Sequence, residues 1–135
     1  MTGEIAKKIN ILMVEDNPAD AFLTSEILAE SERTSYHVTT VKTAFEALAF
    51  LNRMNGYQNA GRPDLILLDL NLPKMHGFDF LAEIRKDSNL TNIPVVVLTT
   101  SEIETDIDKA KELGVNGYLI KPIDLDEFES VILRR

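Results

Sequence analysis

The sequence contains no cysteine, and this absence excludes disulfide bonds, thiolate metal sites and a cysteine nucleophile. It also lacks an apolar run of membrane-spanning length, and residues 1–8 carry charges but no apolar core of a signal peptide. A chain without cysteine fits a reducing compartment. We therefore expect a cytoplasmic protein with no membrane partner.

Basic residues are scarce relative to acidic ones: 14 Lys and Arg stand against 22 Asp and Glu, which gives a net charge of −8 at pH 7. A nucleic-acid-binding protein normally presents a basic surface, so we expect no nucleic-acid partner. Most of the acids should be solvated, but several fall at the ends of predicted strands. The 135 residues suffice for one domain with a sizeable core.

Five apolar segments alternate with five helical patterns. The expected strands are 9–14, 36–41, 65–68, 95–98 and 118–120, and the expected helices are 18–31, 44–51, 78–84, 102–113 and 125–133. The run 65–68 is apolar throughout, which is typical of a parallel strand buried on both faces. Alternation of strand and helix indicates a parallel sheet with helices on both faces. The fold class is therefore α/β, a doubly wound (βα)5 domain over residues 1–135 with its core at 9–133.

Local signals predict several helix ends. Asn17 followed by Pro18 marks the start of the first helix, and Thr43 with Glu46 three residues later forms a capping-box pattern for the second. Gly114 fits the end of the fourth helix. Apolar residues recur at helical spacing in the first helix at Phe22, Leu23, Ile27 and Leu28, and the buried stripe of the fourth is predicted at Ile103, Ile107, Ala110 and Leu113.

Polar side chains follow four of the predicted strands. Glu15 and Asp16 follow the first strand, Asp69 the third, Thr99 the fourth and Lys121 the fifth. In an open α/β sheet ligands bind outside the carboxyl ends of the strands. Three crowded carboxylates repel one another, so a cation is expected, and hard oxygen ligands favour Mg²⁺. Taken one by one, these residues have ordinary alternatives as turn or helix caps or as an exposed lysine.

The motifs that carry these residues resemble those of response-regulator receiver domains, over 9–133. They are Met-Val-Glu-Asp-Asn at 13–17, Leu-Asp-Leu-Asn-Leu-Pro-Lys-Met-His-Gly at 68–77, Val-Leu-Thr-Thr at 97–100 and Tyr-Leu-Ile-Lys-Pro at 118–122. The intervals from Asp69 to Thr99 and from Thr99 to Lys121 also match that family. The resemblance implies a three-layer, flavodoxin-like fold with strand order 2-1-3-4-5.

The resemblance also implies a role for each residue of the site. Asp69 would be the phosphoacceptor, taking a phosphoryl group from a phosphohistidine of a sensor histidine kinase or a phosphotransfer protein. Mg²⁺ would be bound by Glu15, Asp16 and Asp69, with the backbone carbonyl of Asn71 as a further ligand. Lys121 would neutralise charge on the phosphoryl oxygens. Such a protein is a signalling phosphoacceptor that catalyses only its own phosphorylation and dephosphorylation.

The same resemblance implies a conformational switch. Thr99 would hydrogen-bond the phosphoryl group, and the Tyr118 ring would move into the space that Thr99 vacates. The face formed by the fourth helix, fifth strand and fifth helix would then repack for partner binding or homodimerisation. Tyr118 as a plain half-buried strand residue is the alternative. Pro122 is expected to follow a cis peptide bond.

Several features depart from the compact members of that family. The stretch 52–63 is longer, and Glu-Asp at 15–16 and Leu-Asn-Leu-Pro at 70–73 resemble stand-alone regulators that serve phytochrome-type and other sensor kinases. We expect no output domain after Arg135. Thr100, Ser101 and the Asn71 side chain are expected at the entrance to the site, and His76 is interpreted as a turn residue. Ile103, Ile107 and Leu125 could face a partner, but core positions are the expectation.

Three other classes of protein share parts of this pattern. A phosphatase of the haloacid-dehalogenase type also uses an aspartate after a strand, but it carries a second acid where this chain has Asn71. A flavodoxin-like cofactor binder has a hydroxyl-rich or glycine-rich first loop, whereas the loop here is acidic. The third class is a degenerate receiver that serves only for docking, and the complete set of site residues argues against it.

Overall fold

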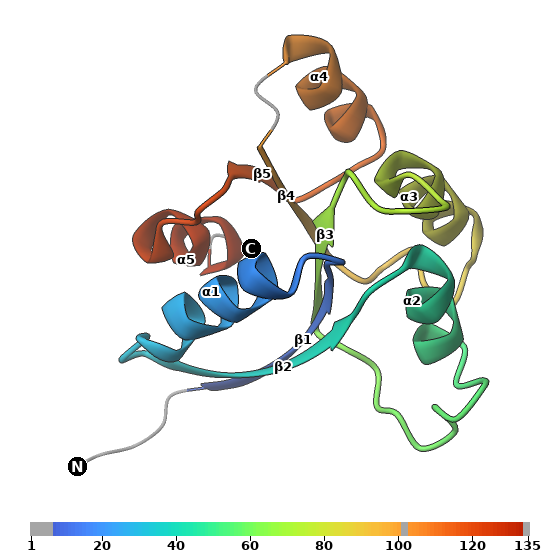
Figure 1. Ribbon diagram of the computed structural model, residues 1–135, viewed down its shortest axis with the longest axis horizontal. Coiled ribbons are helices and arrows are strands. Elements are labelled where there is room, and N and C mark those ends of the chain that lie inside the picture. The colour runs from blue at the N-terminus through green and yellow to red at the C-terminus, as the bar shows by residue number, and fades with distance from the viewer. Residues whose placement is uncertain (1–6, 101–102, 134–135) are drawn as a thin grey trace.

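The computed structural model describes residues 7–100 and 103–133. A five-stranded parallel sheet forms its middle layer, in the order β2-β1-β3-β4-β5 (Figure 1). The strands are β1 (Lys7–Val14), β2 (Thr34–Val41), β3 (Leu65–Asp69), β4 (Val95–Thr99) and β5 (Gly117–Ile120). This is the flavodoxin-like order that the sequence predicted, and β1 and β2 each begin two residues earlier than expected.

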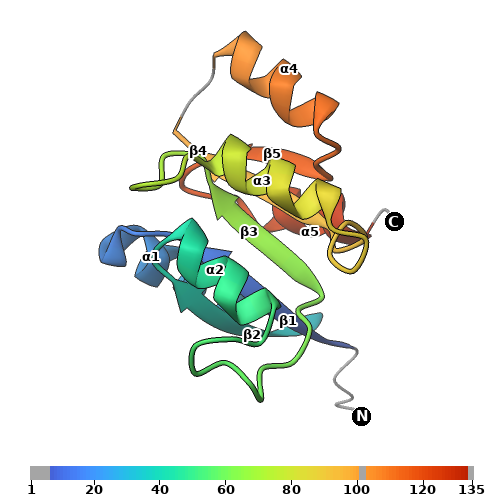
Figure 2. The same ribbon diagram turned by 90° about the vertical axis from the view of Figure 1, so that its right-hand side faces the viewer.

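Helices cover both faces of the sheet. They are α1 (Pro18–Ala29), α2 (Ala44–Leu51), α3 (Gly77–Lys86), α4 (Glu104–Glu112) and α5 (Leu125–Leu133). Helices α1 and α5 lie on one face, and α2, α3 and α4 lie on the other (Figures 1 and 2). Every residue of β3 and β4 is buried, as expected of strands that are covered on both faces. None of the helices in the described ranges is both long and apolar enough to cross a membrane.

The predicted helix caps are present. The Asn17 side chain accepts a hydrogen bond from the backbone N–H of Asp20 at 3.0 Å, and the Thr43 hydroxyl accepts one from the N–H of Glu46 at 3.0 Å. The Glu46 carboxylate accepts from the N–H of Lys42 rather than from that of Thr43, so the second hydrogen bond of the capping box comes from the residue before the N-cap. Gly114 follows α4 in the left-handed region, with φ +76°.

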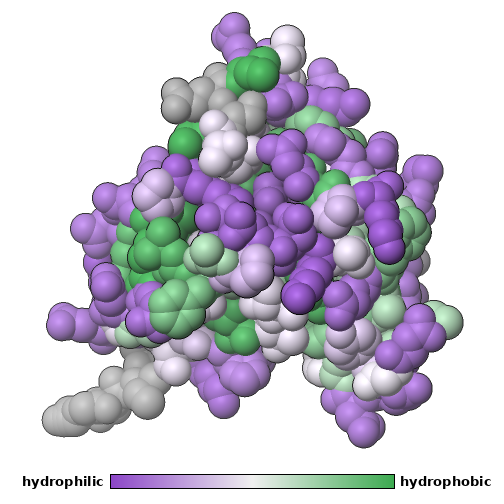
Figure 3. Space-filling model, in the orientation of Figure 1, coloured by the Kyte–Doolittle hydropathy of each residue, from purple (hydrophilic) through white to green (hydrophobic). Residues whose placement is uncertain are grey.

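Fewer of the apolar side chains of α1 are buried than the sequence predicted. Phe22 is 68% exposed and Leu23 47% exposed, whereas Thr24 and Leu28 are the buried residues of α1. Because α1 contacts the sheet through the side that carries Thr24 and Leu28, its other apolar side chains are left at the surface. In Figure 3 hydrophobic side chains gather at the left of the view, where Figure 1 places α1 and α5.

The fourth helix also differs from the expectation. It begins at Glu104, and residues 101–102 lie outside the described ranges. Ile103 is 60% exposed and Ala110 is the buried residue of the helix, so the predicted core stripe is wrong at Ile103. Ala110 packs with Phe78 and Val97, so α4 reaches the core through a small residue near its C-terminal end.

A close backbone approach explains the glycine at the start of α3. A glycine at position 77 permits a tight or a left-handed turn, but the residue of this turn with a left-handed backbone is Lys74, with φ 70°. A Cβ atom added at Gly77 would lie 2.7 Å from the Leu70 Cα and 2.9 Å from the Asp69 carbonyl oxygen. The N–H of Gly77 donates to the Leu70 carbonyl at 2.9 Å. Glycine therefore allows α3 to begin directly against the chain that follows β3.

Candidate functional site

Neighbouring strands bring the predicted residues to one edge of the sheet. Asp69 is in register with Leu98 at the end of β4, and Thr99 is in register with Ile120 at the end of β5. The backbone N–H of Lys121 donates to the Thr99 carbonyl at 2.9 Å. Strand β1 ends beside β3, and this places Glu15 at the same edge. Residues far apart in the sequence thus become neighbours at the carboxyl ends of the strands.

Three carboxylates form a cluster that fits a divalent metal ion. One ligand atom from each of Glu15, Asp16 and Asp69 lies within 4.8 Å of the others. Glu15 and Asp69 are buried, with 3% and 6% exposure, and Asp16 is exposed. Burying two like charges is unfavourable without a compensating cation. Hard oxygen ligands with one side open to water are the donor set that Mg²⁺ and related divalent ions prefer.

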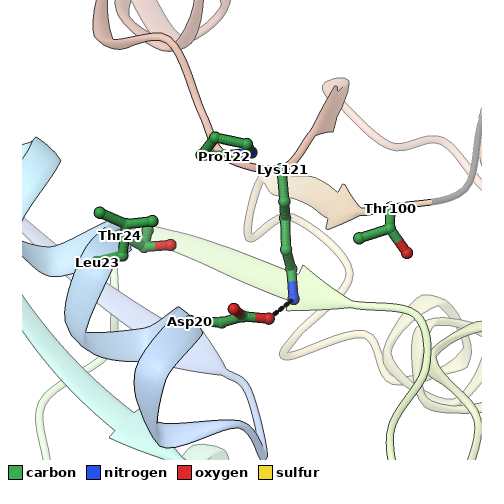
Figure 4. Close-up of a pocket in the computed structure, with 6 residues that line it drawn as sticks. All are labelled: Asp20, Leu23, Thr24, Thr100, Lys121 and Pro122. Carbon is green, nitrogen blue, oxygen red and sulfur yellow. Dashed lines mark hydrogen bonds and ion pairs between the residues drawn. The ribbon is translucent and has the colours of Figure 1, made fainter.

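Lys121 lies among the acids as their partner. Its Nζ atom donates to Glu15 Oε1 at 2.6 Å and to Asp69 Oδ2 at 3.3 Å. A third donation goes to Asp20 Oδ2 at 3.1 Å (Figure 4). The Lys121 side chain is only 11% exposed. One ammonium therefore bridges the ends of β1 and β3 and the first turn of α1.

Asp20 is a residue of the site that was not among the predicted ones. The residue lies four positions after Asp16, in the first turn of the helix that follows the first strand. That position returns a side chain towards the edge of the sheet where the strand ends. The spacing of four residues from an acid at a strand end is the signal by which Asp20 could have been found.

Burial and charge shift the pKa values of Glu15 and Lys121. Burial raises the pKa of Glu15 above its ordinary value of 4.5, and the nearby Asp69 charge adds to this effect, while the Lys121 hydrogen bond opposes it. Burial by itself would lower the pKa of Lys121. The carboxylates of Glu15, Asp20 and Asp69 outweigh burial and raise the pKa of Lys121 above its ordinary value of 10.5. Lys121 is thus firmly protonated at neutral pH.

The Asp69 carboxylate is oriented by two donors on different oxygens. Oδ1 accepts from the backbone N–H of Asn71 at 3.1 Å, and Oδ2 accepts from Lys121. The Asn71 side chain is exposed and takes no part in these two contacts. A buried carboxylate held in a fixed orientation beside a cation is suited to attack on an electrophilic centre.

The remaining predicted residues lie around this centre. Thr99 is fully buried at the end of β4, and Tyr118 is half-buried in β5, where it packs against the cluster that contains Val97 and Ala110. The Lys121–Pro122 peptide bond is cis, as predicted. His76 is a turn residue, as expected: its Nδ1 accepts from the N–H of Phe78 at 3.1 Å and caps α3. Ser101 lies outside the described ranges.

A pocket of about 210 Å³ opens beside the Lys121 side chain (Figure 4). Its walls come from α1, from the end of β4 and from the segment that follows β5, and the lining residues are Asp20, Leu23, Thr24, Thr100, Lys121 and Pro122. Lys121 and Asp20 meet at one side of this pocket, so the ion pair borders open space. The site is therefore accessible next to its buried cation.

The fold and site together define a doubly wound α/β domain whose acid cluster, with a buried lysine at the carboxyl edge of the sheet, fits a divalent metal ion. A family model described as the response regulator receiver domain matches residues 11–133. The chain belongs to this family, the receiver domains of two-component response regulators. Because the chain belongs to this family, it is neither the phosphatase nor the flavodoxin-like cofactor binder that the sequence left as alternatives.

Individual relatives agree with this assignment. The response regulator Rcp1 of Synechocystis sp. is 44% identical over 90% of this chain and 82% of that protein. The crystal structure of the phosphorylated cyanobacterial phytochrome response regulator RcpA has a TM-score of 0.79 at 49% identity, over 92% of this chain and 89% of that chain. The Mn²⁺-bound form of Rcp1 has a TM-score of 0.78 at 45% identity, over 91% and 88% of the two chains.

Proposed function

We propose that Asp69 is the phosphoacceptor of this response regulator and takes its phosphoryl group from a phosphohistidine. The observation that carries this proposal is the placement of the buried Asp69 carboxylate between the Asn71 N–H and the Lys121 ammonium, within the acid cluster. An Asp69 oxygen attacks phosphorus, the O–P bond forms, and the N–P bond to the histidine breaks. The imidazole leaves with its electron pair and takes up a proton, and the product is an aspartyl phosphate.

The other residues have distinct parts in this reaction. Glu15, Asp16 and Asp69, together with the Asn71 carbonyl, would hold Mg²⁺, which supplies positive charge for the phosphoryl oxygens. Lys121 donates a hydrogen bond to one phosphoryl oxygen, and the Thr99 hydroxyl donates to another. Attack by water on the same phosphorus returns the free carboxylate and phosphate. The protein thus catalyses its own phosphorylation and dephosphorylation and acts as a signalling protein rather than as an enzyme on other substrates.

The proposed output is a change of the face formed by α4, β5 and α5. The phosphoryl group draws the Thr99 hydroxyl towards it, and the half-buried Tyr118 ring moves into the vacated space. The repacked face then binds a partner or a second copy of the chain. A Thr99→Ala variant is expected to accept phosphate yet lose phosphorylation-dependent binding, measured by light scattering or partner titration. Thr40→Ala, an exposed threonine of β2, is the matched control and should bind like the wild type.

A phytochrome-type sensor kinase is the proposed donor. The support is the relationship to RcpA, which is a cyanobacterial phytochrome response regulator, and to Rcp1. A phosphotransfer protein offers the same phosphohistidine chemistry and is the second candidate. The cytoplasm is the proposed location, because a chain without cysteine fits a reducing compartment.

Phosphotransfer from a labelled kinase tests the proposal. A phytochrome-type histidine kinase is autophosphorylated with radiolabelled ATP, freed of nucleotide and mixed with the chain and Mg²⁺. The label should move to the wild type and to Asp79→Asn, which removes an exposed aspartate in the first turn of α3, but not to Asp69→Asn. Transfer of label to Asp69→Asn at the wild-type rate would show that another residue is the acceptor.

A further inference from the structure

Asp20 is a fourth acid at the site, and its carboxylate accepts one of the hydrogen bonds that the Lys121 ammonium donates. A lysine ammonium has three N–H donors and no acceptor. All three have carboxylate partners: Glu15 at 2.6 Å, Asp20 at 3.1 Å and Asp69 at 3.3 Å. In this arrangement Lys121 has no proton left for a phosphoryl oxygen. One carboxylate must give way before Lys121 can bind the incoming group.

The free energy needed to break the contact with Lys121 differs among the three carboxylates. The Glu15 side chain is 3% exposed and makes the shortest contact with Lys121, so water cannot readily replace the ammonium there. The Asp69 side chain is 8% exposed and is the proposed nucleophile, so it stays beside the phosphorus. The Asp20 side chain is 40% exposed, and water can replace the ammonium there at small cost. Asp20 is the partner that Lys121 releases most readily.

The surroundings of Asp20 allow this release. Asp20 lies on the first turn of α1, where its carboxylate also benefits from the helix N-terminus when it is not paired with Lys121. The pocket of about 210 Å³ beside the ion pair is lined by Asp20 and Lys121 and opens to solvent, as Figure 4 shows for its lining residues. The carboxylate can therefore turn into open space without disturbing the core.

We propose that Asp20 is an internal competitor of the phosphoryl group for Lys121, and that it slows phosphorylation of the resting protein. This inference rests on the proposed roles of Asp69 and Lys121, and it adds Asp20 as a residue that slows their reaction. Asp20 acts through Lys121 and does not touch the reacting atoms, so it is a positioning residue. In the resting state it holds the ammonium, and during transfer a phosphoryl oxygen takes its place.

This competition has a distinct kinetic signature. The Asp20–Lys121 pair exists in the resting state but is broken both in the transition state and in the aspartyl phosphate. Removing Asp20 therefore lowers the barrier to phosphorylation and leaves the barrier to hydrolysis unchanged, because only differences between two states alter a rate. A half-exposed ion pair gives an expected gain of about twofold to fivefold in the phosphorylation rate constant.

The test compares both rate constants in matched variants. Wild type, Asp20→Asn, Asp20→Ala, Asp20→Glu and Asp79→Asn are treated with phosphoramidate at a Mg²⁺ concentration shown to saturate each variant. Intact mass then follows the gain of phosphate and, after donor removal, its loss. Asp79 is the control because it is an exposed aspartate in the first turn of a helix and is not an ion-pair partner of Lys121.

The expected result is faster phosphorylation of Asp20→Asn and Asp20→Ala at every donor concentration, with an unchanged hydrolysis rate. Asp20→Glu, which keeps the carboxylate, should remain near the wild type. Titration with beryllofluoride and Mg²⁺, followed by amide chemical shifts, should show tighter binding by the same factor, a readout that needs no turnover. Asp79→Asn should match the wild type in all three measurements.

Several results would overturn the competition. Unchanged or slower phosphorylation of Asp20→Asn would do so, as would an equal gain in Asp79→Asn or a hydrolysis rate that changes in parallel. A wild type that gains phosphate neither from phosphoramidate nor from the phosphorylated kinase would instead refute the proposed role of Asp69, and the inference would fall with it. If the wild type is phosphorylated normally and Asp20→Asn is phosphorylated at the same rate, only the inference about Asp20 is refuted, and the proposed role of Asp69 stands.

Discussion

Lys121 is a single cation that pairs with several carboxylates. In the described part of the chain it is the cation that forms ion pairs with Glu15, Asp20 and Asp69, and Asp16 adds a further negative charge at the surface. A single ammonium does not neutralise four carboxylates. The site therefore retains excess negative charge, and this is the physical reason to expect a divalent cation there.

Asp16 provides the sharpest test of the metal. An ion that binds only the folded state stabilises it by about 2.7 kcal/mol at a hundredfold excess over its dissociation constant. Added Mg²⁺ should therefore raise the melting temperature of the wild type, and Asp16→Asn should lose most of that rise. Calorimetry with and without Mg²⁺ measures both. Asp79→Asn should retain the full rise, and an equal rise in Asp16→Asn would remove Asp16 from the metal site.

A third buried acid, Glu129, lies away from the site and connects three elements. Glu129 of α5 is 4% exposed and accepts hydrogen bonds from the Ser31 hydroxyl at 2.6 Å and from the Tyr36 hydroxyl at 2.8 Å. Burial, and then this carboxylate, raise the pKa of Tyr36 well above its ordinary value of 10.0. The end of α1, strand β2 and helix α5 are thus held together through one carboxylate.

The raised pKa of Tyr36 predicts a loss of stability in alkali. Below pH 10 both states keep the phenol proton, whereas above it the unfolded chain releases the proton and the folded chain does not, so the free energy of unfolding falls as the pH rises. Tyr36→Phe should reduce this alkaline loss. At pH 7 it should cost about 1.5–3 kcal/mol, because a buried carboxylate loses a donor.

Denaturant titrations at pH 7 and at pH 10.5 measure both effects. Tyr57→Phe is the matched control, since Tyr57 also donates to a glutamate, Glu46, but lies half-buried near the surface. It should cost no more than about 1 kcal/mol at pH 7. A Tyr36→Phe variant as stable as Tyr57→Phe would show that the Glu129 contacts do not hold these elements together.

At the scale of elements, strands were more predictable than helix faces. Strands β3 and β4 are apolar throughout, so the sequence alone showed that they are covered on both sides and that Asp69 and Thr99 stand at their ends. The faces of α1 and α4 were not predictable in this way. Phe22 and Ile103 fit a helical stripe, but which stripe faces the sheet depends on tertiary packing.

Contacts that cross between elements were the least predictable. The spacing of Asp20 places it near the site but gives no sign that it meets Lys121, because this pairing depends on how far the Lys121 side chain extends from the end of β5 towards α1 (Figure 4). The reason for Gly77 was equally hidden: the sequence showed a glycine, and only the structure shows the Leu70 backbone 2.7 Å from the place of a Cβ atom. Local sequence patterns predict where an element begins more readily than what it touches.

Gly77 gives the prediction that belongs to this scale. Gly77→Ala places a methyl group against the backbone of Leu70 and Asp69, so α3 must move away from β3 at a cost of about 1–3 kcal/mol. Chemical denaturation measures the loss. Gly61→Ala is the control, because a Cβ there meets nothing within 4 Å, and its stability should equal or slightly exceed that of the wild type. Equal stability of the two variants would refute the close-approach explanation.

At the scale of the whole molecule, one sheet separates two helical layers and gathers the charged site at one edge (Figures 1 and 2). Large apolar side chains are exposed on several elements, among them Phe22 on α1 and Ile103 at the start of α4. Strands β4 and β5 pair beside this edge and carry Thr99 and Tyr118. This arrangement supports an output through the face of α4, β5 and α5.

Self-association through that face is the corresponding prediction. The wild type with beryllofluoride and Mg²⁺ should shift towards a dimer in light scattering, and Ile103→Glu should weaken the shift because it places a charge on the face. Met54→Glu is the matched control: Met54 is 57% exposed, close to the 60% of Ile103, but it follows α2 on another part of the surface. Equal weakening by both variants would place the interface elsewhere.

The most direct test of the central claim is the intact mass of the protein after incubation with acetyl phosphate and Mg²⁺. The account predicts a gain of one phosphoryl group in the wild type and in Asp79→Asn, no gain in Asp69→Asn, and loss of the gain when Mg²⁺ is chelated. A gain of the same size in Asp69→Asn, or a wild type that stays unmodified with both acetyl phosphate and a phosphorylated kinase, would contradict it.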